Sequence, residues 1–349
     1  MGYGKNADRV AGALSRLLHL RGARENTVGY LHQYLDLSAE ELFPEPKPIQ
    51  DLEVRRTIVD RALRTSTLRW TSTHSVLCPR YRRRHENEYR RNLTAWARWI
   101  RPEGAPRKTA LIYVHGWLEP GSWAEEATLF RRWAKELDTD LVHVALPFHG
   151  PRKPRDALFS GEYFWTADLV RSMEGVRQAT CDARALMAWL RGQGYERVGV
   201  TGISLGGAIT MLFACLRPFP DFIVPIISHL ELAAAVEYAP ILWRMRRDLE
   251  RWGIDREQRR DLFERIGMSR FAPLLSPERQ LWIQAREDVY IDAAVAESQW
   301  RDWGRPNILW IDGGHMTFPL HLDEITQRIG DFLAGVAPLS TDQEASAVA

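Results

Sequence analysis

The sequence has few cysteines, no long apolar run and almost no excess of either charge. Its three cysteines, Cys78, Cys181 and Cys215, lie far apart, form no CxxC pair and leave an odd thiol in any disulfide scheme. No stretch of about 18 apolar residues occurs, which excludes an ordinary membrane-spanning helix. The first residues also lack the apolar core and small-residue cleavage site of a secretory signal. These absences predict a soluble cytoplasmic protein.

The charge balance argues against a polyanionic partner. Lys and Arg number 47 against 45 Asp and Glu, a formal net charge of +2, so nucleic acid is not an expected partner. Arginine is concentrated in the first hundred residues, which allows peripheral membrane contact, although an ordinary solvated face explains it more simply. Because no His-x-x-x-His pair or cysteine cluster occurs, neither a metal nor another cofactor is expected.

Residues 1–66 predict a helical N-terminal extension. Apolar residues recur there at helical spacing, namely Val10, Leu14, Leu17 and Leu18. A proline-rich break follows at residues 44–48, and a second helix is predicted over residues 51–64.

An α/β-type alternation occupies residues 67–335. Two β-leaning runs, 67–77 and 93–100, predict an antiparallel edge pair joined by a basic turn over residues 80–91. Further strands are predicted at 110–115, 141–146, 197–201, 223–227, 280–285 and 307–311, with helices at 123–137, 166–190, 208–216 and 322–333. Short apolar strands alternating with helices require a mostly parallel sheet covered on both faces. The predicted fold is therefore a doubly wound α/β domain.

Two segments stand outside this alternation. Residues 229–277 are helical and rich in charge, with predicted helices at 242–252 and 256–266. The segment is too long for a plain connection, which predicts an insertion that lies over a site as a lid. Residues 336–349 are small and polar and are expected to be disordered.

The clearest chemical signal is the run Gly202-Ile203-Ser204-Leu205-Gly206-Gly207. It follows the apolar strand at 197–201 and opens an apolar helix, as a nucleophile elbow requires. The turn is so tight that its flanking residues must lack bulk, and the serine hydroxyl is raised above the sheet. We therefore predict that Ser204 is a nucleophile.

A serine nucleophile needs a base and a supporting acid, both of which the sequence offers after the elbow. His315 follows the last predicted strand in a glycine-flanked loop, and His321 is the alternative base. Asp288 follows the strand at 280–285, with Glu287 and Asp292 as alternatives. The chain order serine, acid, histidine that this architecture uses favours Asp288 and His315.

The oxyanion formed during acyl transfer needs two backbone N–H donors. One is expected from Leu205, next after the nucleophile, and the other from Trp117 in the loop His115-Gly116-Trp117 that follows the strand at 110–115. His115 is expected to organise this loop.

These residues resemble the α/β-hydrolase superfamily over about Thr67 to Ala334. The resemblance assigns the family's His-Gly loop to His115-Gly116, its elbow to residues 202–206 and its acid and base to Asp288 and His315. A further run, Leu-Pro-Phe-His-Gly-Pro-Arg at residues 146–152, followed by Ser160-Gly161, is similar to a branch of mostly uncharacterised bacterial hydrolases with a helical N-terminal extension. Fold and chemistry are implied by such a resemblance, whereas substrate is not.

The pattern as a whole predicts a serine hydrolase that cleaves a small-molecule or lipid ester through an acyl-enzyme. Acyltransferase, thioesterase and peptidase activities use the same residues and stay open, while a non-enzymatic binding module is disfavoured because no catalytic member is missing. His115, His149 and Arg152 are the predicted substrate contacts. The arginines of the 229–277 insertion and the positive charges of the loop Arg152-Lys153-Pro154-Arg155 would favour substrates with an acidic group, although ordinary surface arginines on a solvated loop explain them more simply.

Overall fold

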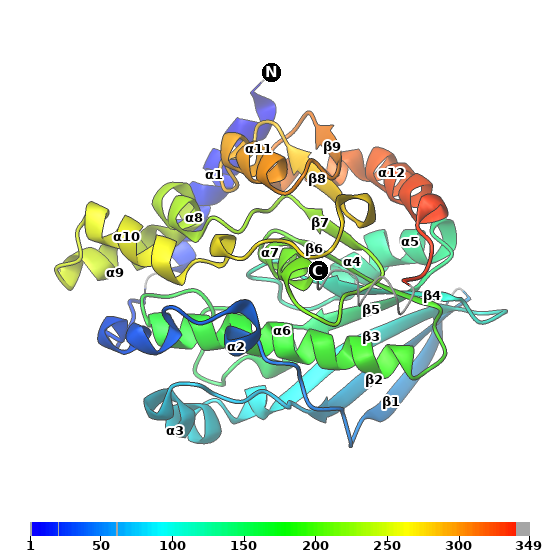
Figure 1. Cartoon of the computed structure of the whole chain (residues 1–349), viewed down its shortest axis with the longest axis horizontal. Helices are drawn as coiled ribbons and strands as arrows, with labels where there is room; N and C mark the ends of the chain where they lie inside the picture. Colours follow the sequence, from blue (N-terminus) through cyan, green and yellow to red (C-terminus); the bar gives the residue numbers. More distant parts are fainter. Residues whose placement is uncertain (1, 20, 61, 340–349) are drawn as a thin grey trace.

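The centre of the fold is a nine-stranded sheet with helices on both faces (Figure 1). The computed structural model describes residues 2–19, 21–60 and 62–339. The strands are β1 (Glu53–Asp60), β2 (Leu63–Thr71), β3 (Thr94–Pro102), β4 (Thr109–Val114), β5 (Asp140–Ala145), β6 (Arg197–Ile203), β7 (Ile223–Ile226), β8 (Leu281–Ala285) and β9 (Asn307–Ile311). Their spatial order is β1-β2-β3-β5-β4-β6-β7-β8-β9.

The helices alternate with the strands from β4 onward. They are α1 (Tyr3–Leu18), α2 (Ala39–Leu42), α3 (Pro79–Asn87), α4 (Trp123–Glu125), α5 (Arg131–Glu136), α6 (Leu169–Arg191), α7 (Leu205–Leu212), α8 (Leu232–Tyr238), α9 (Trp243–Arg251), α10 (Arg256–Ile266), α11 (Ala293–Asp302) and α12 (Leu322–Gly335). Short 3₁₀ turns include η1 (Val28–Tyr34), η2 (Arg90–Leu93), η4 (Gly150–Arg152), η5 (Phe213–Cys215), η6 (Pro240–Leu242), η7 (Met268–Arg270), η8 (Pro277–Arg279) and η9 (His315–His321), and η3 (Glu126–Phe130) is a π-helical turn. Within the described ranges, every helix is too short or too polar to span a bilayer.

The sheet divides into an antiparallel edge and a parallel body, which confirms the predicted doubly wound fold. Strands β1, β2, β3 and β5 pair antiparallel, whereas β5, β4, β6, β7, β8 and β9 pair parallel. Every residue of β4 and β5 is buried. Strands buried on both faces read as continuous apolar runs, which is the pattern that the sequence shows.

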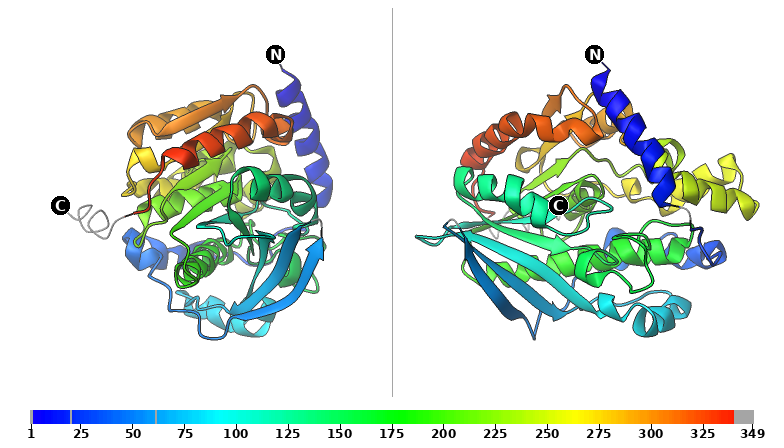
Figure 2. Two further views of the ribbon diagram at one scale, coloured as in Figure 1. Left: turned by 90° about the vertical axis from the view of Figure 1, so that its right-hand side faces the viewer. Right: turned by 180° about the vertical axis from the view of Figure 1, so that it is seen from behind.

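Two core layers cover the two faces of the sheet. In β4, Ile112 and Val114 join the core beneath α6 and α7, while Leu111 and Tyr113 join the core beneath α5 and α12. Figure 2 shows α6 and α12 on opposite sides of the sheet. Since side chains alternate along a strand, β4 contributes to both layers.

The prediction of a helix over residues 51–64 is wrong. Residues 53–60 form β1 and residues 63–64 begin β2, and a register shift between Arg55 and Ile58 interrupts their pairing. Every residue of β1 is exposed, so no amphipathic pattern marks the strand. Its β-branched Val54, Thr57, Ile58 and Val59 favour extended structure because two heavy atoms on Cβ restrict the side chain in a helix.

Several other segments match their predicted secondary structure only in part. The basic segment at 80–91 is not a turn but contains α3 and η2, and α11 was not anticipated. Residues 336–339 pack on the domain, where the Leu339 N–H donates to Asp221 Oδ1 at 2.8 Å. The rest of the predicted disordered tail, residues 340–349, lies outside the described residues. Insertion 229–277 does contain the predicted helices, α9 and α10, together with α8.

Candidate active site

The turn between β6 and α7 holds Ser204 in a strained conformation. Its φ of 55° and ψ of −117° are rare for a residue with a side chain, and such strain is characteristic of a nucleophile elbow. The Ser204 N–H donates to Ile226 O at 2.9 Å, which ties the turn to β7. The turn requires glycine at both Gly202 and Gly206, because a Cβ on either residue would overlap neighbouring backbone.

Replacing Gly206 with alanine tests how tightly the elbow is packed. The added Cβ would overlap Val114 O and lie 2.6 Å from His115 O, so β4 or α7 must move. We expect the free energy of unfolding to fall by about 3 kcal/mol, measured by urea denaturation. Gly29→Ala is the control, because a Cβ there meets nothing within 4 Å. Equal stability of the two variants would contradict the packing argument.

Asp288 and His315 meet at the carboxyl edge of the sheet. His315 Nδ1 lies 2.7 Å from Asp288 Oδ2, and the carboxylate also accepts the N–H groups of Tyr290 (2.7 Å) and Ile291 (2.8 Å) at Oδ1. Burial lowers the pKa of His315, but the Asp288 charge and hydrogen bond raise it, and the net direction is upward. This pairing places the proton on Nδ1 and leaves Nε2 free as a base.

The alternative acids and base have other partners. Glu287 accepts the N–H groups of Gly2 (2.6 Å) and Gly4 (3.0 Å) at the start of α1. Asp292 caps α11, and His321 lies 3.7 Å from Glu324. The structure thus brings Asp288, rather than Glu287 or Asp292, to His315.

The loop after β4 lies directly against the elbow. A Cβ built on Gly116 would lie 3.8 Å from Ser204 Cβ, so the loop backbone passes the serine closely. The Trp117 indole donates to Gly161 O at 2.8 Å, which fixes that residue. Leu205 begins α7, and the N–H groups of a first helical turn have no partner within the helix. The backbones of Trp117 and Leu205 are therefore both placed beside Ser204.

Ser204 and His315 open onto one cavity of about 720 Å³, within the size range of small-molecule sites. The cavity walls are mostly apolar and include Ala11, Leu14, Trp117, Leu118, Leu129, Trp165, Val176, Leu205, Ile209, Leu212, Ile227, Leu232, Ile241, Leu242, Met268, Ile291, Met316 and Phe318. Among the described residues no hydrogen bond joins Ser204 Oγ to His315 Nε2; catalytic hydrogen bonds often tighten only with substrate bound. Both α1 and the 229–277 insertion contribute to the walls.

The family comparisons agree with this architecture. The family model "Alpha/beta hydrolase domain containing 18" matches residues 94–244. The acetyl xylan esterase of Paenibacillus sp. R4 superposes with a TM-score of 0.62 at 14% identity, over 91% of this chain and 98% of that chain. Acetyl xylan esterase 1 of Thermoanaerobacterium sp. JW/SL YS485 gives 0.58 at 15% identity, over 92% and 98%. The chain has the α/β-hydrolase fold.

Two curated relatives of this chain come from Mycobacterium tuberculosis. "Uncharacterized protein Rv2627c" of strain ATCC 25618 / H37Rv is 30% identical over 216 residues, which cover 60% of this chain and 50% of the relative. "Uncharacterized protein MT2702" of strain CDC 1551 / Oshkosh matches equally. The chain thus spans about half the length of the curated relatives it matches.

Arg152 does not line the cavity that Ser204 and His315 share, so the predicted substrate contact is corrected. Its side chain is fully buried, forms an ion pair with Asp182 at 2.8 Å and donates to Ala145 O and Asn92 O. A buried guanidinium needs such partners to offset its lost hydration. The positive charge at this position therefore holds the loop after β5 and does not select acidic substrates.

His115 and His149 lie behind the cavity wall, where each organises the loop after β4. Leu146 N–H donates to His115 Nε2 at 3.0 Å, which leaves the proton on Nδ1 to be donated to Gly116 O at 2.7 Å. Leu118 N–H similarly donates to His149 Nε2 at 3.3 Å. Both rings are buried, and burial lowers the pKa of each. The two histidines therefore support the loop after β4 and do not line the cavity, which corrects their predicted contact with substrate.

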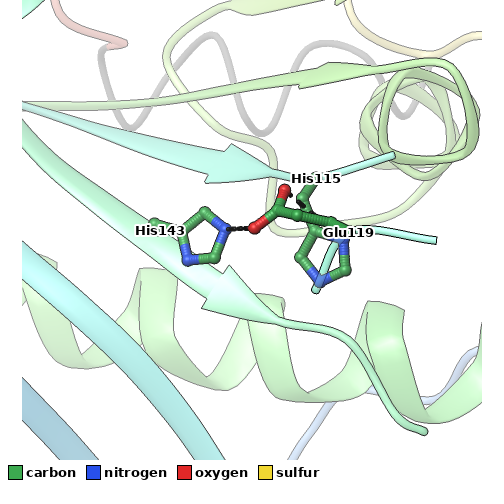
Figure 3. A group of neighbouring side chains, drawn as sticks. All are labelled: His115, Glu119 and His143. Atoms are coloured by element: carbon green, nitrogen blue, oxygen red, sulfur yellow. Dashed lines mark hydrogen bonds and ion pairs between the residues drawn. The ribbon is translucent and has the colours of Figure 1, made fainter. Parts of the chain in front are cut away.

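His115, Glu119 and His143 form a buried cluster with the atom types of a metal site (Figure 3). The potential ligand atoms lie within 4.8 Å of one another. However, the partners of His115 place a proton on its Nδ1, and His143 Nε2 is hydrogen-bonded to Glu119 Oε1 at 2.8 Å. Burial favours the protonated Glu119, but the two imidazoles lower its pKa to about 2. The donor set fits a hydrogen-bonded network around the loop better than a metal.

The sequence did not identify two residues of the site, His229 and Asp8. His229 follows β7 and lines the cavity, and neither ring nitrogen has a partner among the described residues. Burial lowers its pKa to about 4, so the ring is neutral. The sequence does place His229 just after a predicted parallel strand, and ligand sites lie at the carboxyl ends of such strands, so this position could have identified it. Asp8 is the only acid among the first 24 residues, a composition that gives no hint of its contacts with the loops of Asp288 and His315.

Proposed function

We propose that this α/β hydrolase is a serine hydrolase that cleaves carboxylic esters of apolar acyl groups. Ser204 is the nucleophile, His315 the general base and Asp288 the acid that supports it. The observation that carries the proposal is the shared apolar cavity of Ser204 and His315, with Asp288 paired to the far nitrogen of the imidazole at 2.7 Å. A hydroxyl is a poor nucleophile without such a base.

In the first half of the reaction, His315 Nε2 takes the proton of Ser204 as Oγ attacks the ester carbonyl carbon. The negative charge that develops on the carbonyl oxygen is stabilised by the N–H groups of Leu205 and Trp117. Collapse of this intermediate breaks the bond to the alcohol oxygen, which receives the proton from His315. Ser204 is left as an ester of the acyl group.

In the second half, water replaces the alcohol. His315 removes a proton from the water as its oxygen attacks the acyl carbon, and the same N–H groups stabilise the second intermediate. Collapse returns the proton to Ser204 Oγ and releases the carboxylic acid. Asp288 stabilises the imidazolium in both halves, because its carboxylate lies against Nδ1.

The cavity supports an apolar acyl group as the bound part of the substrate. Most of its wall is aliphatic or aromatic, contributed by α7, α8, α1 and the loop after β4. Leu14 and Met316 line the cavity and are also largely exposed, at 59% and 53%, so they lie at its mouth. Inside the cavity, the neutral imidazole of His229 can form a hydrogen bond with a hydroxyl or carbonyl group of the substrate.

The test is covalent labelling together with an ester panel. A fluorophosphonate is expected to add one adduct to the wild type, mapped to Ser204 by peptide mass spectrometry, and none to Ser204→Ala. p-Nitrophenyl esters from acetate to laurate are expected to show kcat/KM rising with chain length, because burying each CH₂ contributes about 0.8 kcal/mol. An adduct on another residue, or none, refutes the nucleophile; a preference for acetate refutes the apolar acyl site.

A further inference from the structure

Helix α1 lies against the loops that carry the proposed acid and base. Figure 2 shows it running beside the β8 and β9 end of the sheet, far in sequence from both strands. It packs on η9, which begins at His315, and on η6. A Cβ on Gly4 would overlap Gly314 N and lie 2.8 Å from Gly313 C, so the helix approaches the His315 loop as closely as backbone allows.

The Asp8 carboxylate joins α1 to both loops. Oδ2 accepts the N–H groups of His315 (2.8 Å) and Val289 (3.1 Å), while Oδ1 accepts that of Met316 (2.8 Å). Val289 follows Asp288 directly. One carboxylate therefore bridges the backbone of the proposed acid to the backbone of the proposed base.

The burial of Asp8 makes these bonds important for the geometry. Its side chain is 0% exposed, and its partners are backbone N–H groups. Hydrogen bonds to an ionised carboxylate are about twice as strong as neutral ones. A buried carboxylate that lost them would carry the full cost of desolvation, so the two loops and α1 are held in one arrangement.

We propose that Asp8 is a positioning residue that fixes His315 relative to Asp288, and that the catalytic centre is complete only when α1 is docked. The proposal rests on the proposed function for the roles of Asp288 and His315. Asp8 does not contact the reacting atoms, and it acts through the backbone of the base and of the residue after the acid. Helix α1 thus positions the proposed base and also lines the cavity.

The charge of Asp8 should also act on the His315 imidazole, because the carboxylate binds the backbone N–H of the same residue. The titratable groups facing His315 are Asp288, Asp8 and Tyr290, whose ring centroid lies 4.9 Å from the imidazole. Burial and both carboxylates raise the pKa of Tyr290 to about 12, so it is neutral near pH 7. Burial lowers the pKa of His315, whereas Asp288 and, to a smaller extent, Asp8 raise it.

The experiment is an NMR titration of the His315 imidazole in full-length wild type, Asp8→Asn and Asp8→Glu, with the resonance assigned from His315→Gln. Asp8→Asn should lower the pKa of His315, because it removes a negative charge that stabilises the imidazolium. Asp8→Glu keeps the charge but changes the reach, so its pKa should stay nearer the wild-type value. In ester hydrolysis, kcat should fall about 10- to 100-fold in both variants with a smaller change in KM. The acid limb of the pH profile should move to lower pH in Asp8→Asn alone.

Asp221→Asn is the matched control. Asp221 is also a buried aspartate that accepts N–H groups from two segments, Val198 and Leu339, each at 2.8 Å, but it lies outside the cavity wall. It should lower the unfolding midpoint and leave the His315 titration unchanged. An unchanged His315 pKa in folded Asp8→Asn overturns the proposal, as does a loss of stability with normal kcat. Because the titration needs no turnover, an inactive wild type would refute the proposed function separately.

Discussion

Replacing Ser204 with alanine is expected to lower kcat for carboxylic ester hydrolysis by about 10⁶-fold, leaving the roughly 10³- to 10⁴-fold acceleration over water that the oxyanion hole and binding provide. The change removes the atom that attacks the substrate ester in the proposed mechanism. It leaves His315 paired to Asp288, because that contact does not involve the serine. The fold should tolerate the smaller side chain, since Ser204 has no side-chain hydrogen bond at the start of α7. Burst-phase and steady-state kinetics with a p-nitrophenyl ester measure the loss.

The control for this prediction is Ser276→Ala. Ser276 is an exposed serine outside the cavity wall, and its replacement should leave kcat unchanged. Residual turnover by Ser204→Ala should show no burst, because no acyl-enzyme can form. A variant that retains a burst would show that another residue carries the acyl group.

The elbow and the strands around it could be predicted because their signals are local. Gly202 and Gly206 are required by backbone contacts within one turn, and the strand before them and the helix after them are adjacent in sequence. The same holds for the loop at His115-Gly116. Asp288 and His315 are distant from the elbow in sequence, but each follows a parallel strand, and the carboxyl ends of parallel strands share one edge.

The contribution of α1 could not be predicted, because it depends on contacts across the whole chain. Asp8 and His315 are 307 positions apart. On the helix itself, Asp8 is one polar residue among many, and its burial is a consequence of docking. The apolar spacing of Val10 and Leu14 did predict a helix, yet both are largely exposed, at 61% and 59%. Periodicity therefore identified the helix but not the surface it covers.

Arg152 shows the opposite failure, in which a sequence signal had the wrong meaning. An arginine in a loop after a strand is usually solvated, and the loop lies near the expected edge of the site. In the structure its guanidinium turns inward to Asp182 on α6 and is fully buried. The partner lies 30 positions away in a helix, so sequence alone gives no reason to pair them.

The structure also predicts a large effect for Asp288→Asn through the tautomer of His315. Asp288 Oδ1 accepts the N–H groups of Tyr290 and Ile291, and in the variant the amide oxygen is expected to keep that place because its NH₂ cannot accept. The NH₂ group then faces His315 Nδ1, which must accept a hydrogen bond. The proton moves to Nε2, and His315 can no longer take the proton of Ser204.

We therefore expect kcat to fall about 10⁴-fold for Asp288→Asn with little change in the ester KM, the size of loss that the wrong tautomer produces in a serine protease. Asp292→Asn is the matched control, because asparagine also caps helices and Asp292 caps α11 outside the cavity wall. Nitrogen chemical shifts of the His315 ring read the tautomer directly. A wild-type tautomer with reduced kcat would assign the loss to charge instead, and a near-normal kcat in Asp288→Asn would show that Asp288 does not support the base.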